Sequence, residues 1–467
     1  KTTSGNIALA AGLTSAGNVS LNAAGDVTQS ADGDITLTGS GMTLDVLASG
    51  DITMNATAVS QTKQGSVRYQ ATSGAIALGQ INTADAGNVG TSGVALVAGT
   101  NIADADADNG AVLTNVTTAT LLMTAGSTTS SATGIGSASN AIETDVATLA
   151  LRSGSAGAFV LESNALSIDA VSSTINRVNA QGTTATQSDS GEDANSGGIL
   201  VVQAGGTLTI NGGTASATSG INATGNVLLK TTNSGNIALA AGLTSAGNVS
   251  LDASGNVTQS ADGDITLTGS ATTLDVLATG SITMTDGAVS QTNNADVRYS
   301  AGSSLALSQI NAGTANVAVV AGSGAITDAE NGSAVNNVIA GKVLMTAGTA
   351  IGTSTNAIET SVGTLSTRSS AGSTFITEAS DVTIDSVSVL THNVLSTGAL
   401  HGTDNTVTQE DLVTVGTNSV LVVQAGGTLT INGGATSAAS GINATGNVLL
   451  KTTSGNIALA AGLTSAG

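Results

Sequence analysis

Residues 5–21 read GNIALAAGLTSAGNVSL, and residues 33–37 repeat the opening pattern as Gly-Asp-Ile-Thr-Leu. Each unit starts with Gly followed by Asn or Asp, and apolar residues then alternate with small polar ones. Gly and Asn tolerate the positive φ angles of a sharp corner, whereas Val and Ile favour extended backbone. The alternation therefore predicts a short strand after each Gly-Asx corner. No apolar period of 3.6 residues supports a helix.

The same text recurs at long range. GNIALAAGLTSAGNVSL returns at residues 235–251, and the first seventeen residues return letter for letter at residues 451–467. The distance between copies falls from 230 residues (5 to 235) to 216 residues (140 to 356), as expected when insertions fall in surface turns. The chain is therefore divided into two super-repeats, residues 1–229 and 230–450, and the start of a third, residues 451–467. This pattern indicates a window from a longer array.

Short strands at even spacing predict a solenoid in which each coil stacks on the one before. The expected fold is all-β, a right-handed parallel β-helix forming an elongated rod, since parallel crossovers are almost always right-handed. A row of stacked β-sandwich domains is the alternative. Ala8, Ser20 and Thr36 are expected to face water. The alternation predicts an aliphatic core row composed of Ile7, Leu9, Val19, Leu21, Ile35 and Leu37.

The composition excludes several classes of protein. There is no Cys, so disulfides and thiolate metal sites are excluded, and there is no Pro, so collagen is excluded. Ten basic residues face 31 acidic ones, which argues against a nucleic-acid partner. A mean hydropathy of +0.28 argues against disorder. No apolar run approaches the length of a transmembrane segment, and the N-terminus lacks the pattern of a signal peptide.

The repeat units carry a family resemblance. Residues 5–12, GNIALAAG, and residues 25–29, GDVTQ, resemble the shaft repeats of filamentous haemagglutinin-like adhesins. Residues 135–168 and 351–384 resemble segments of giant haemagglutinin-like surface proteins. The resemblance implies a right-handed β-helix, a bacterial cell-surface or extracellular location, and a role as a structural fibre or adhesin stalk. The N-terminal secretion domain of that family, with its Asn-Pro motif, has no counterpart here.

A calcium site is the first chemical hypothesis. Asp104, Asp106 and Asp108 stand at every second residue, which is the opening spacing of a calcium loop. Asn109 displaces the glycine of that loop, and no Glu closes it. A solvated Asp-rich turn is therefore the alternative. Asn and Asp at successive corners are also expected to share hydrogen bonds along the stack.

Other binding or catalytic sites have weaker signals. Tyr69 and Arg68, matched by Tyr299 and Arg298, could stack and bind a sugar, or the tyrosines could cover the core. Glu143 and other duplicated carboxylates could serve a polysaccharide-cleaving enzyme, but they are expected to face solvent, and we expect no enzymatic activity. The remaining hypotheses are a self-associating structural fibre and an adhesin with lateral binding sites for glycans or other cells.

Overall fold

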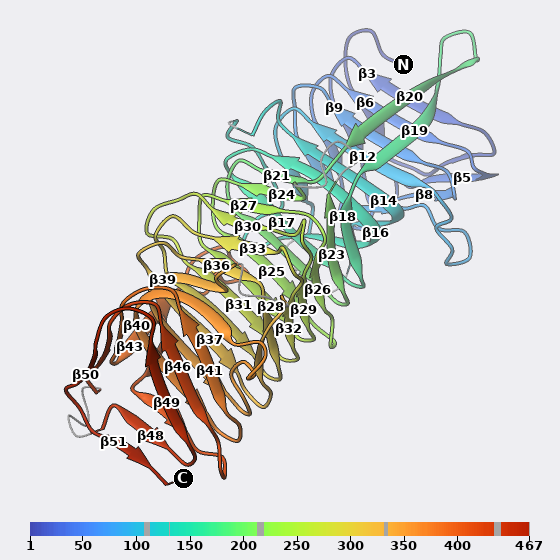
Figure 1. Ribbon diagram of the computed structural model, residues 1–467. Helices are drawn as coiled ribbons and strands as arrows, with labels where there is room; N and C mark the ends of the chain where they lie inside the picture. Colours follow the sequence, from blue (N-terminus) through green and yellow to red (C-terminus); the bar gives the residue numbers. More distant parts are fainter. Residues whose placement is uncertain (107–112, 130, 213–218, 331–334, 434–439, 467) are drawn as a thin grey trace. The chain divides into compact units, whose positions relative to one another are not determined.

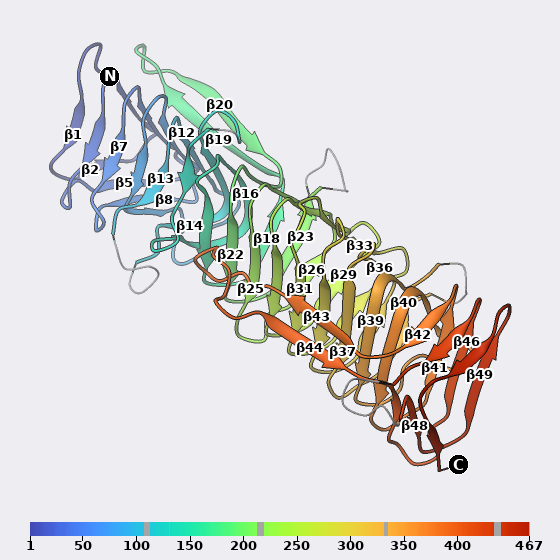
Figure 2. The same cartoon turned by 90° about the vertical axis from the view of Figure 1, so that its left-hand side faces the viewer.

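The computed structural model describes residues 1–106, 113–129, 131–212, 219–330, 335–433 and 440–466. All regular structure in these residues is β-strand (Figures 1 and 2). No helix long and apolar enough to span a membrane occurs among them. The chain divides into two units, the first comprising Lys1–Gly235 with Ser396–Ala399 and the second Asn236–Leu395 with Leu400–Gly467.

In unit 1 the strands pair in parallel ladders, each strand on the equivalent strand of the next coil. The first ladder contains β1 (Ile7–Leu9), β4 (Val27–Gln29), β7 (Ile52–Met54), β10 (Ile76–Leu78), β13 (Ile102–Asp104), β15 (Gly134–Ile135), β17 (Gly157–Glu162), β22 (Leu200–Ala204) and β25 (Val227–Thr231). The second contains β2 (Leu13–Ser15), β5 (Ile35–Ser40), β8 (Val59–Lys63), β11 (Gln80–Asn82), β14 (Val116–Ala125) and β16 (Ile142–Ser153). The third contains β3 (Val19–Ala23), β6 (Leu44–Ala48), β9 (Val67–Ala71) and β12 (Gly93–Ala98), and it joins β14. Beyond β16 the ladders continue through β18 (Leu166–Asp169) to β23 (Leu208–Gly212), and through β21 (Ala194–Ser196) to β24 (Ile221–Ala223).

Unit 2 repeats this arrangement. Its first ladder contains β26 (Ile237–Leu239), β29 (Val257–Gln259), β32 (Ile282–Met284), β35 (Leu305–Leu307) and β38 (Ile326–Asp328), and continues through a bridge at Ile351 to β41 (Thr374–Glu378), β46 (Leu421–Ala425) and β49 (Val448–Thr452). Its second contains β27 (Leu243–Ser245), β30 (Ile265–Leu267), β33 (Val289–Gln291), β36 (Gln309–Asn311), β39 (Val338–Ala347) and β40 (Ile358–Ser369). Its third contains β28 (Val249–Ala253), β31 (Leu274–Ala278), β34 (Val297–Ala301) and β37 (Asn316–Ala321), and it joins β39. From β40 the ladders continue through β42 (Val382–Ile384), β47 (Leu429–Ile431) and β50 (Ile457–Leu459), and through β45 (Leu412–Thr414), β48 (Ile442–Ala444) and β51 (Leu463–Ser465).

These parallel ladders confirm the predicted parallel β-helix. The pairing is in register, with Ile7 opposite Val27 and Leu13 opposite Ile35, so apolar residues of successive coils stack on one another. A thin core of this kind favours aliphatic side chains, because each layer is only one strand spacing of about 4.8 Å thick.

The expected core row is buried unevenly. Ile35 and Leu37 are 1% and 0% exposed, whereas Ile7, Leu9, Val19 and Leu21 are half-buried because they lie in the first described coil. The equivalent residues of unit 2, in β26, β28 and β30, are all buried. Of the residues expected to face water, Ala8 does so, but Thr36 and Ser20 are half-buried.

Two of the Gly-Asx corners, at Gly25 and Gly50, have a different physical basis from the positive φ that the sequence indicated, whereas Gly5 does have a positive φ (127°). Asn6 Oδ1 accepts a hydrogen bond from Asp26 N (2.8 Å), and Asp26 Oδ1 accepts one from Asp51 N (2.9 Å). A Cβ on Gly25 or Gly50 would lie 2.1 Å from the corner oxygen of the preceding coil, and neither glycine has a positive φ. At Gly25 and Gly50, glycine therefore leaves room for the corner side chain of the coil before it.

The predicted sharing of hydrogen bonds between corners is present, since Asn6 Nδ2 donates to Asp26 Oδ2 (3.2 Å). The dominant contact, however, is from a backbone amide to the preceding corner. The same ladder occurs in unit 2, where Asn236 Oδ1 accepts from Asn256 N and Asn256 Oδ1 accepts from Ser281 N, both at 2.8 Å.

Each unit also contains an antiparallel hairpin that the sequence pattern did not predict. In unit 1 the hairpin is β19 (Val171–Val178) with β20 (Thr184–Gly191), and β19 packs across β3, β6, β9, β12 and β14 (Figure 1). In unit 2 it is β43 (Val387–Thr391) with β44 (Asn405–Gln409), and β43 packs across β34, β37 and β39 (Figure 2). Ser20 is half-buried for this reason, because its Oγ accepts a hydrogen bond from Val178 N (2.8 Å).

Candidate functional site

A cluster of four opposite charges lies beneath the hairpin of unit 1. Asp45, on β6, is 1% exposed and lies between two guanidinium groups. Arg177 Nε lies 2.5 Å from Asp45 Oδ2, and Arg68 Nη1 lies 3.4 Å from Asp45 Oδ1. Arg68 Nε also lies 2.5 Å from Asp189 Oδ2 on β20. Two positive and two negative charges therefore join the hairpin to the coils below it.

Unit 2 has the same site with half of the charges. Arg298 makes two hydrogen bonds to Asp275, Nε to Oδ1 and Nη2 to Oδ2, both 2.7 Å long. The register of the hairpin places Val407 at the position of Asp189. Asn405, two residues earlier, donates from Nδ2 to Asp275 Oδ2 (3.3 Å). The position of Arg177 is taken by Asn393. One positive and one negative charge are thus absent together, and the net charge of the cluster is unchanged.

The Asp-rich segment of the calcium hypothesis forms a turn after β13. Asp104 is 8% exposed, and its Oδ1 accepts hydrogen bonds from Asn115 Nδ2 (2.6 Å) and from Asp106 N (3.2 Å). A carboxylate that accepts from the amide two residues later forms an Asx turn. Asp108 lies outside the described residues. Within the described part of the chain, no three or more His, Asp or Glu side chains are grouped so as to hold a metal ion, and calcium binding stays a prediction.

The equivalent turn of unit 2 has the same hydrogen bonds, and Asp286, Glu330 and Glu359 lie close to it. Asp328 Oδ1 accepts from Asn337 Nδ2 (2.7 Å) and from Glu330 N (3.0 Å). Burial, followed by the charges of Asp328 and Glu330, raises the pKa of Glu359 to about 7. Burial, followed by the charges of Asp286 and Asp328, also raises the pKa of Glu330. Like charges in a buried corner disfavour ionisation.

The duplicated glutamates, Glu143, Glu162, Glu359 and Glu378, are buried, so the expectation that they face solvent was wrong. The duplicated aspartates, Asp169 and Asp385, are half-buried. Glu162 is 1% exposed, and its Oε2 accepts hydrogen bonds from Thr144 Oγ1 (2.7 Å) and Val146 N (3.0 Å). Its Oε1 accepts one from Asn164 N (2.9 Å). Burial raises the pKa of Glu162 to about 7, although these hydrogen bonds lower it. Glu143 is also buried, at 5% exposed. Glu162 thus satisfies backbone and hydroxyl donors where β16 meets β17.

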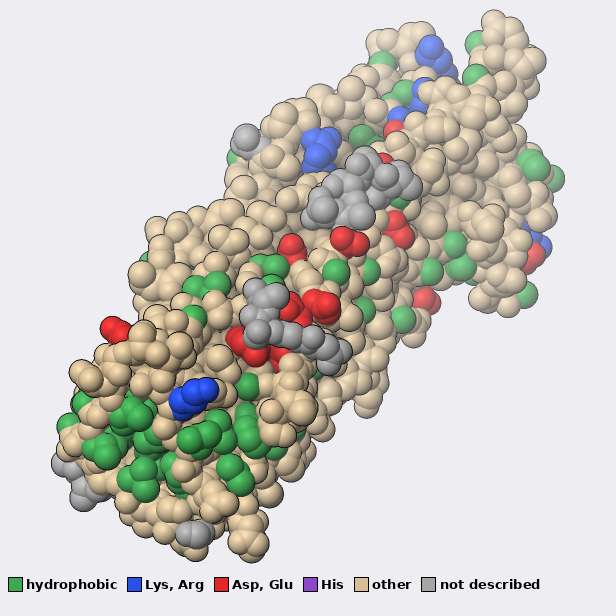
Figure 3. All heavy atoms as spheres, viewed as in Figure 1, with side chains coloured by type: hydrophobic (Ala, Val, Ile, Leu, Met, Phe, Trp, Pro, Cys, Tyr) green, Lys and Arg blue, Asp and Glu red, His purple; other side chains and the backbone are tan. Residues whose placement is uncertain are grey.

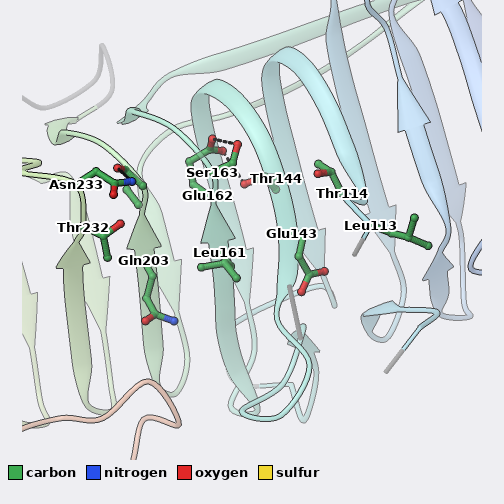
Figure 4. A pocket seen from close by; sticks show the side chains of 12 residues that line it. Leu113, Thr114, Glu143, Thr144, Leu161, Glu162, Ser163, Gln203, Thr232 and Asn233 are labelled. Carbon is green, nitrogen blue, oxygen red and sulfur yellow. Dashed lines mark hydrogen bonds between the residues drawn. The ribbon is translucent and has the colours of Figure 1, made fainter. Parts of the chain in front are cut away.

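A groove of about 360 Å³ in unit 1 runs past Glu162 (Figure 4). Thr144 and Ser163 point toward Glu162, whereas Glu143 lies apart from it. Gln203 and Asn233 line the groove from neighbouring coils, so its wall offers amide and hydroxyl groups. Groups of this kind bind polar ligands through hydrogen bonds.

The tyrosines of the sugar-binding hypothesis lie inside the solenoid. Tyr69 and Tyr299 are 1% and 0% exposed. The hydroxyl of Tyr69 lies 2.6 Å from Ser60 Oγ and 3.3 Å from Gln29 Oε1, and Tyr299 has the same contacts in unit 2. Neither ring offers a face on which a sugar could stack, so this part of the hypothesis was wrong and the core-covering alternative is the one observed.

The sequence reasoning missed the cluster around Asp45. The signal available was the pairing of Asp45 with Arg68 in one super-repeat and of Asp275 with Arg298 in the other, at the same spacing. The positions of Arg177 and Asp189 depend on a hairpin that no periodicity indicates. Comparisons with protein-family models, curated proteins and solved structures gave no match to this chain.

Proposed function

We propose that this chain is a structural shaft segment of a bacterial cell-surface or extracellular repetitive protein, acting through the stacking of its coils. The observation that carries the proposal is the corner ladder, in which the Asx side chain of one coil accepts a hydrogen bond from the backbone of the next. The corner side chains and the backbone amides thus form hydrogen bonds between successive coils. A mechanical spacer needs such contacts along its length. Copies of the same chain are the partner that such a surface favours.

The arrangement of charge also supports a shaft. Several charged groups are buried. Asp45 and Asp275 form ion pairs with arginines beneath the hairpins, and Glu162 accepts hydrogen bonds from buried donors. On the face drawn in Figure 3, Asp and Glu side chains gather in groups, whereas Lys and Arg are scattered. An excess of negative charge favours solubility and disfavours nonspecific association with nucleic acid. The extracellular location rests on the resemblance to haemagglutinin-like shafts.

An adhesin with lateral binding sites is the second candidate, and the groove in unit 1 favours it. Gln203→Ala would remove an amide from that groove, and Gln424→Ala is the matched control in unit 2. If the groove binds glycans, Gln203→Ala should reduce retention on a glycan array while Gln424→Ala should not. Equal retention of both variants and the parent chain would exclude this groove as the binding site.

The shaft function is tested by removing one super-repeat. The sequence GNVLLKTT occurs at residues 225–232 and at residues 446–453, so deletion of 230–450 joins Leu229 to Lys451 without changing this text. A shaft with half of its coils should still be displayed, and it should hold a terminal tag about half as far from the cell surface, as measured by electron microscopy. An unchanged distance to the tag, or loss of the β-sheet circular dichroism signal, would contradict the proposal.

A further inference from the structure

Two carboxylate oxygens of unit 2 are buried without a hydrogen-bond donor. Asp328, at the end of β38, is 9% exposed, and Glu359, on β40, is 7% exposed. Asp328 Oδ1 accepts two hydrogen bonds, but among the described residues no donor reaches Asp328 Oδ2 or Glu359 Oε2. A buried charged oxygen without a donor has lost its hydration and gained nothing in return. These two oxygens therefore favour a positively charged partner.

Two asparagines hold the acidic residues in place. Asn337 Nδ2 donates to Asp328 Oδ1 (2.7 Å), and Asn337 Oδ1 accepts from Glu359 N (2.9 Å), so one side chain joins the two residues. Asn356 Nδ2 donates to Glu330 O (2.6 Å), which fixes the turn that follows Asp328. Neutral amide groups thus position both carboxylates, and they do not neutralise the negative charge.

Further acidic side chains surround these two. After burial, the charges of Asp328 and Glu330 raise the pKa of Glu359. After burial, the charges of Asp286 and Asp328 raise the pKa of Glu330. In the part of the chain that the structure describes, none of these four residues forms an ion pair with Lys, Arg or His. We call these four residues the acidic cluster of unit 2.

The same frame of hydrogen bonds occurs in unit 1. Asn115 Nδ2 donates to Asp104 Oδ1 (2.6 Å), and Asn115 Oδ1 accepts from Glu143 N (2.9 Å). Asn140 Nδ2 donates to Asp106 O (2.6 Å). Here too, no donor from the described residues reaches Asp104 Oδ2. The aspartate and its asparagine lie 11 positions apart in unit 1 and 9 in unit 2, so the frame does not depend on the number of residues between them.

We propose that the acidic cluster of unit 2 binds a calcium ion, with Asp328 Oδ2 and Glu359 Oε2 as its carboxylate ligands. The cluster offers only oxygen atoms, which are the ligands that hard divalent cations prefer. Calcium accepts irregular sets of carboxylate, carbonyl and water oxygens, whereas magnesium demands a nearly octahedral set. A turn beside a strand provides an irregular set, so calcium is the better match. The two ligands also carry the charge that neutralises a divalent ion.

This site differs from the loop that the spacing of Asp104, Asp106 and Asp108 indicated. Its two carboxylates come from two strands, β38 and β40, in place of three carboxylates from one loop. The strand β40 pairs with β39, which follows β38 in the preceding coil. A calcium ion between Asp328 and Glu359 therefore joins two successive coils, and it should stabilise their contact.

Isothermal titration calorimetry of the full chain, freed of metal with a chelator, tests the site. The chain should bind calcium with a Kd of about 10⁻⁴–10⁻³ M, the range of extracellular calcium modules. Glu359→Gln keeps the size of the side chain and removes its charge, so it should lower the number of calcium ions bound per chain by one. Asp328→Asn should have the same effect. Calcium should raise the melting temperature of the parent chain by more than that of Glu359→Gln, and circular dichroism verifies that each variant stays folded.

Glu378→Gln is the matched control. Glu378 is 1% exposed in the same unit, but its Oε2 accepts hydrogen bonds from Thr360 Oγ1 (2.7 Å) and Val362 N (3.1 Å). This variant should bind as many calcium ions as the parent chain. Loss of one ion in Glu378→Gln as well would show a response to net charge and would overturn the site.

Three other results would also overturn the proposal. The first is equal binding of calcium by the parent chain and Glu359→Gln. The second is no binding by the parent chain at millimolar calcium, since the two carboxyls would then share a proton instead of an ion. The third is tighter binding of magnesium than of calcium, which would contradict the assignment of the ion.

Discussion

The Gly-Asx corner allows a sharp test of what holds one coil on the next. An ideal Cβ on Gly50 would lie 2.1 Å from Asp26 Oδ1, which is the oxygen that accepts the hydrogen bond from Asp51 N. Gly50→Ala must therefore push the carboxylate of the preceding coil aside. Gly17 begins another Gly-Asx unit, Gly-Asn-Val, yet a Cβ there would meet no atom within 4 Å. Gly17→Ala is therefore the matched control.

The expected size of the effect follows from three contributions. Forcing a methyl group into filled space costs about 1–3 kcal/mol. Losing the hydrogen bond to a carboxylate costs about 1.5 kcal/mol. Replacing Gly by Ala also lowers the conformational entropy of the unfolded chain, which offsets these costs by about 0.5–1 kcal/mol. Gly50→Ala should therefore destabilise its coil by about 1.5–4 kcal/mol, whereas Gly17→Ala should be neutral or stabilising by about 0.5 kcal/mol.

Amide hydrogen exchange at Asp51 and Ile52 measures the loss at the coil concerned, which suits a repeat protein that need not unfold in one step. A background variant sharpens the test. In the Asp26→Ala variant the obstructing oxygen is absent. The effect of Gly50→Ala on the stability of the coil should therefore change from destabilising to neutral or stabilising in this background. Equal protection factors in Gly50→Ala and Gly17→Ala, or the same penalty with and without Asp26, would refute the steric explanation.

Three more outcomes are expected. Asp189→Asn leaves Arg68 without its closest partner and should lower the protection of the hairpin amides against hydrogen exchange by about 2 kcal/mol. Adding Arg177→Asn should recover part of this loss, because the double variant has the charge balance of the unit 2 cluster. Strictly additive effects of the two substitutions would contradict the charge network. Ile35→Asp should lower the free energy of unfolding in urea by about 3 kcal/mol or more, and Thr36→Asp by under about 1 kcal/mol. Only Ile35→Asp places a carboxylate in the aliphatic core. Equal losses in the two variants would place Ile35 outside that core. The carboxyl of Glu162 has a folded-state pKa of about 7 against 4.5 for an ordinary Glu, so between those values the folded protein holds a proton that the unfolded chain releases. The contribution of Glu162 to the free energy of unfolding is full below pH 4.5 and is lost as the pH rises to about 7. Glu162→Gln should therefore reduce the fall in melting temperature between pH 5 and pH 8. An unchanged fall in the variant would disprove the raised pKa of Glu162.

The alternation of apolar and polar residues was sufficient to predict the parallel solenoid, because each coil repeats the same local rule. It placed Ile35 and Leu37 correctly inside the core. The alternation could not distinguish a residue within the stack from a residue in its first described coil. Leu9 was therefore expected in the core but is only half-buried, whereas Leu239 is buried. Period and composition describe one coil, whereas burial depends on its neighbours.

The hairpins and the charge clusters could not be predicted from the sequence for a different reason. The contact between Asp45 and Arg177 joins residues 132 positions apart, and neither belongs to a recognisable motif. Glu162 was expected in solvent because an acidic residue usually is, and only the donors of Thr144, Val146 and Asn164 explain its burial. Partners that meet only after folding leave no local pattern in the sequence.

The corner side chains described above accept hydrogen bonds from backbone amides in one direction. Asn236 receives the amide of Asn256, which in turn receives the amide of Ser281, so every acceptor faces a coil that comes later in the chain. A polypeptide that emerges from a ribosome or an export pore with its N-terminus leading thus presents a finished template to each new turn. Construction in the reverse order would lay down amides before their acceptors existed. The molecule is therefore suited to vectorial assembly, one winding at a time.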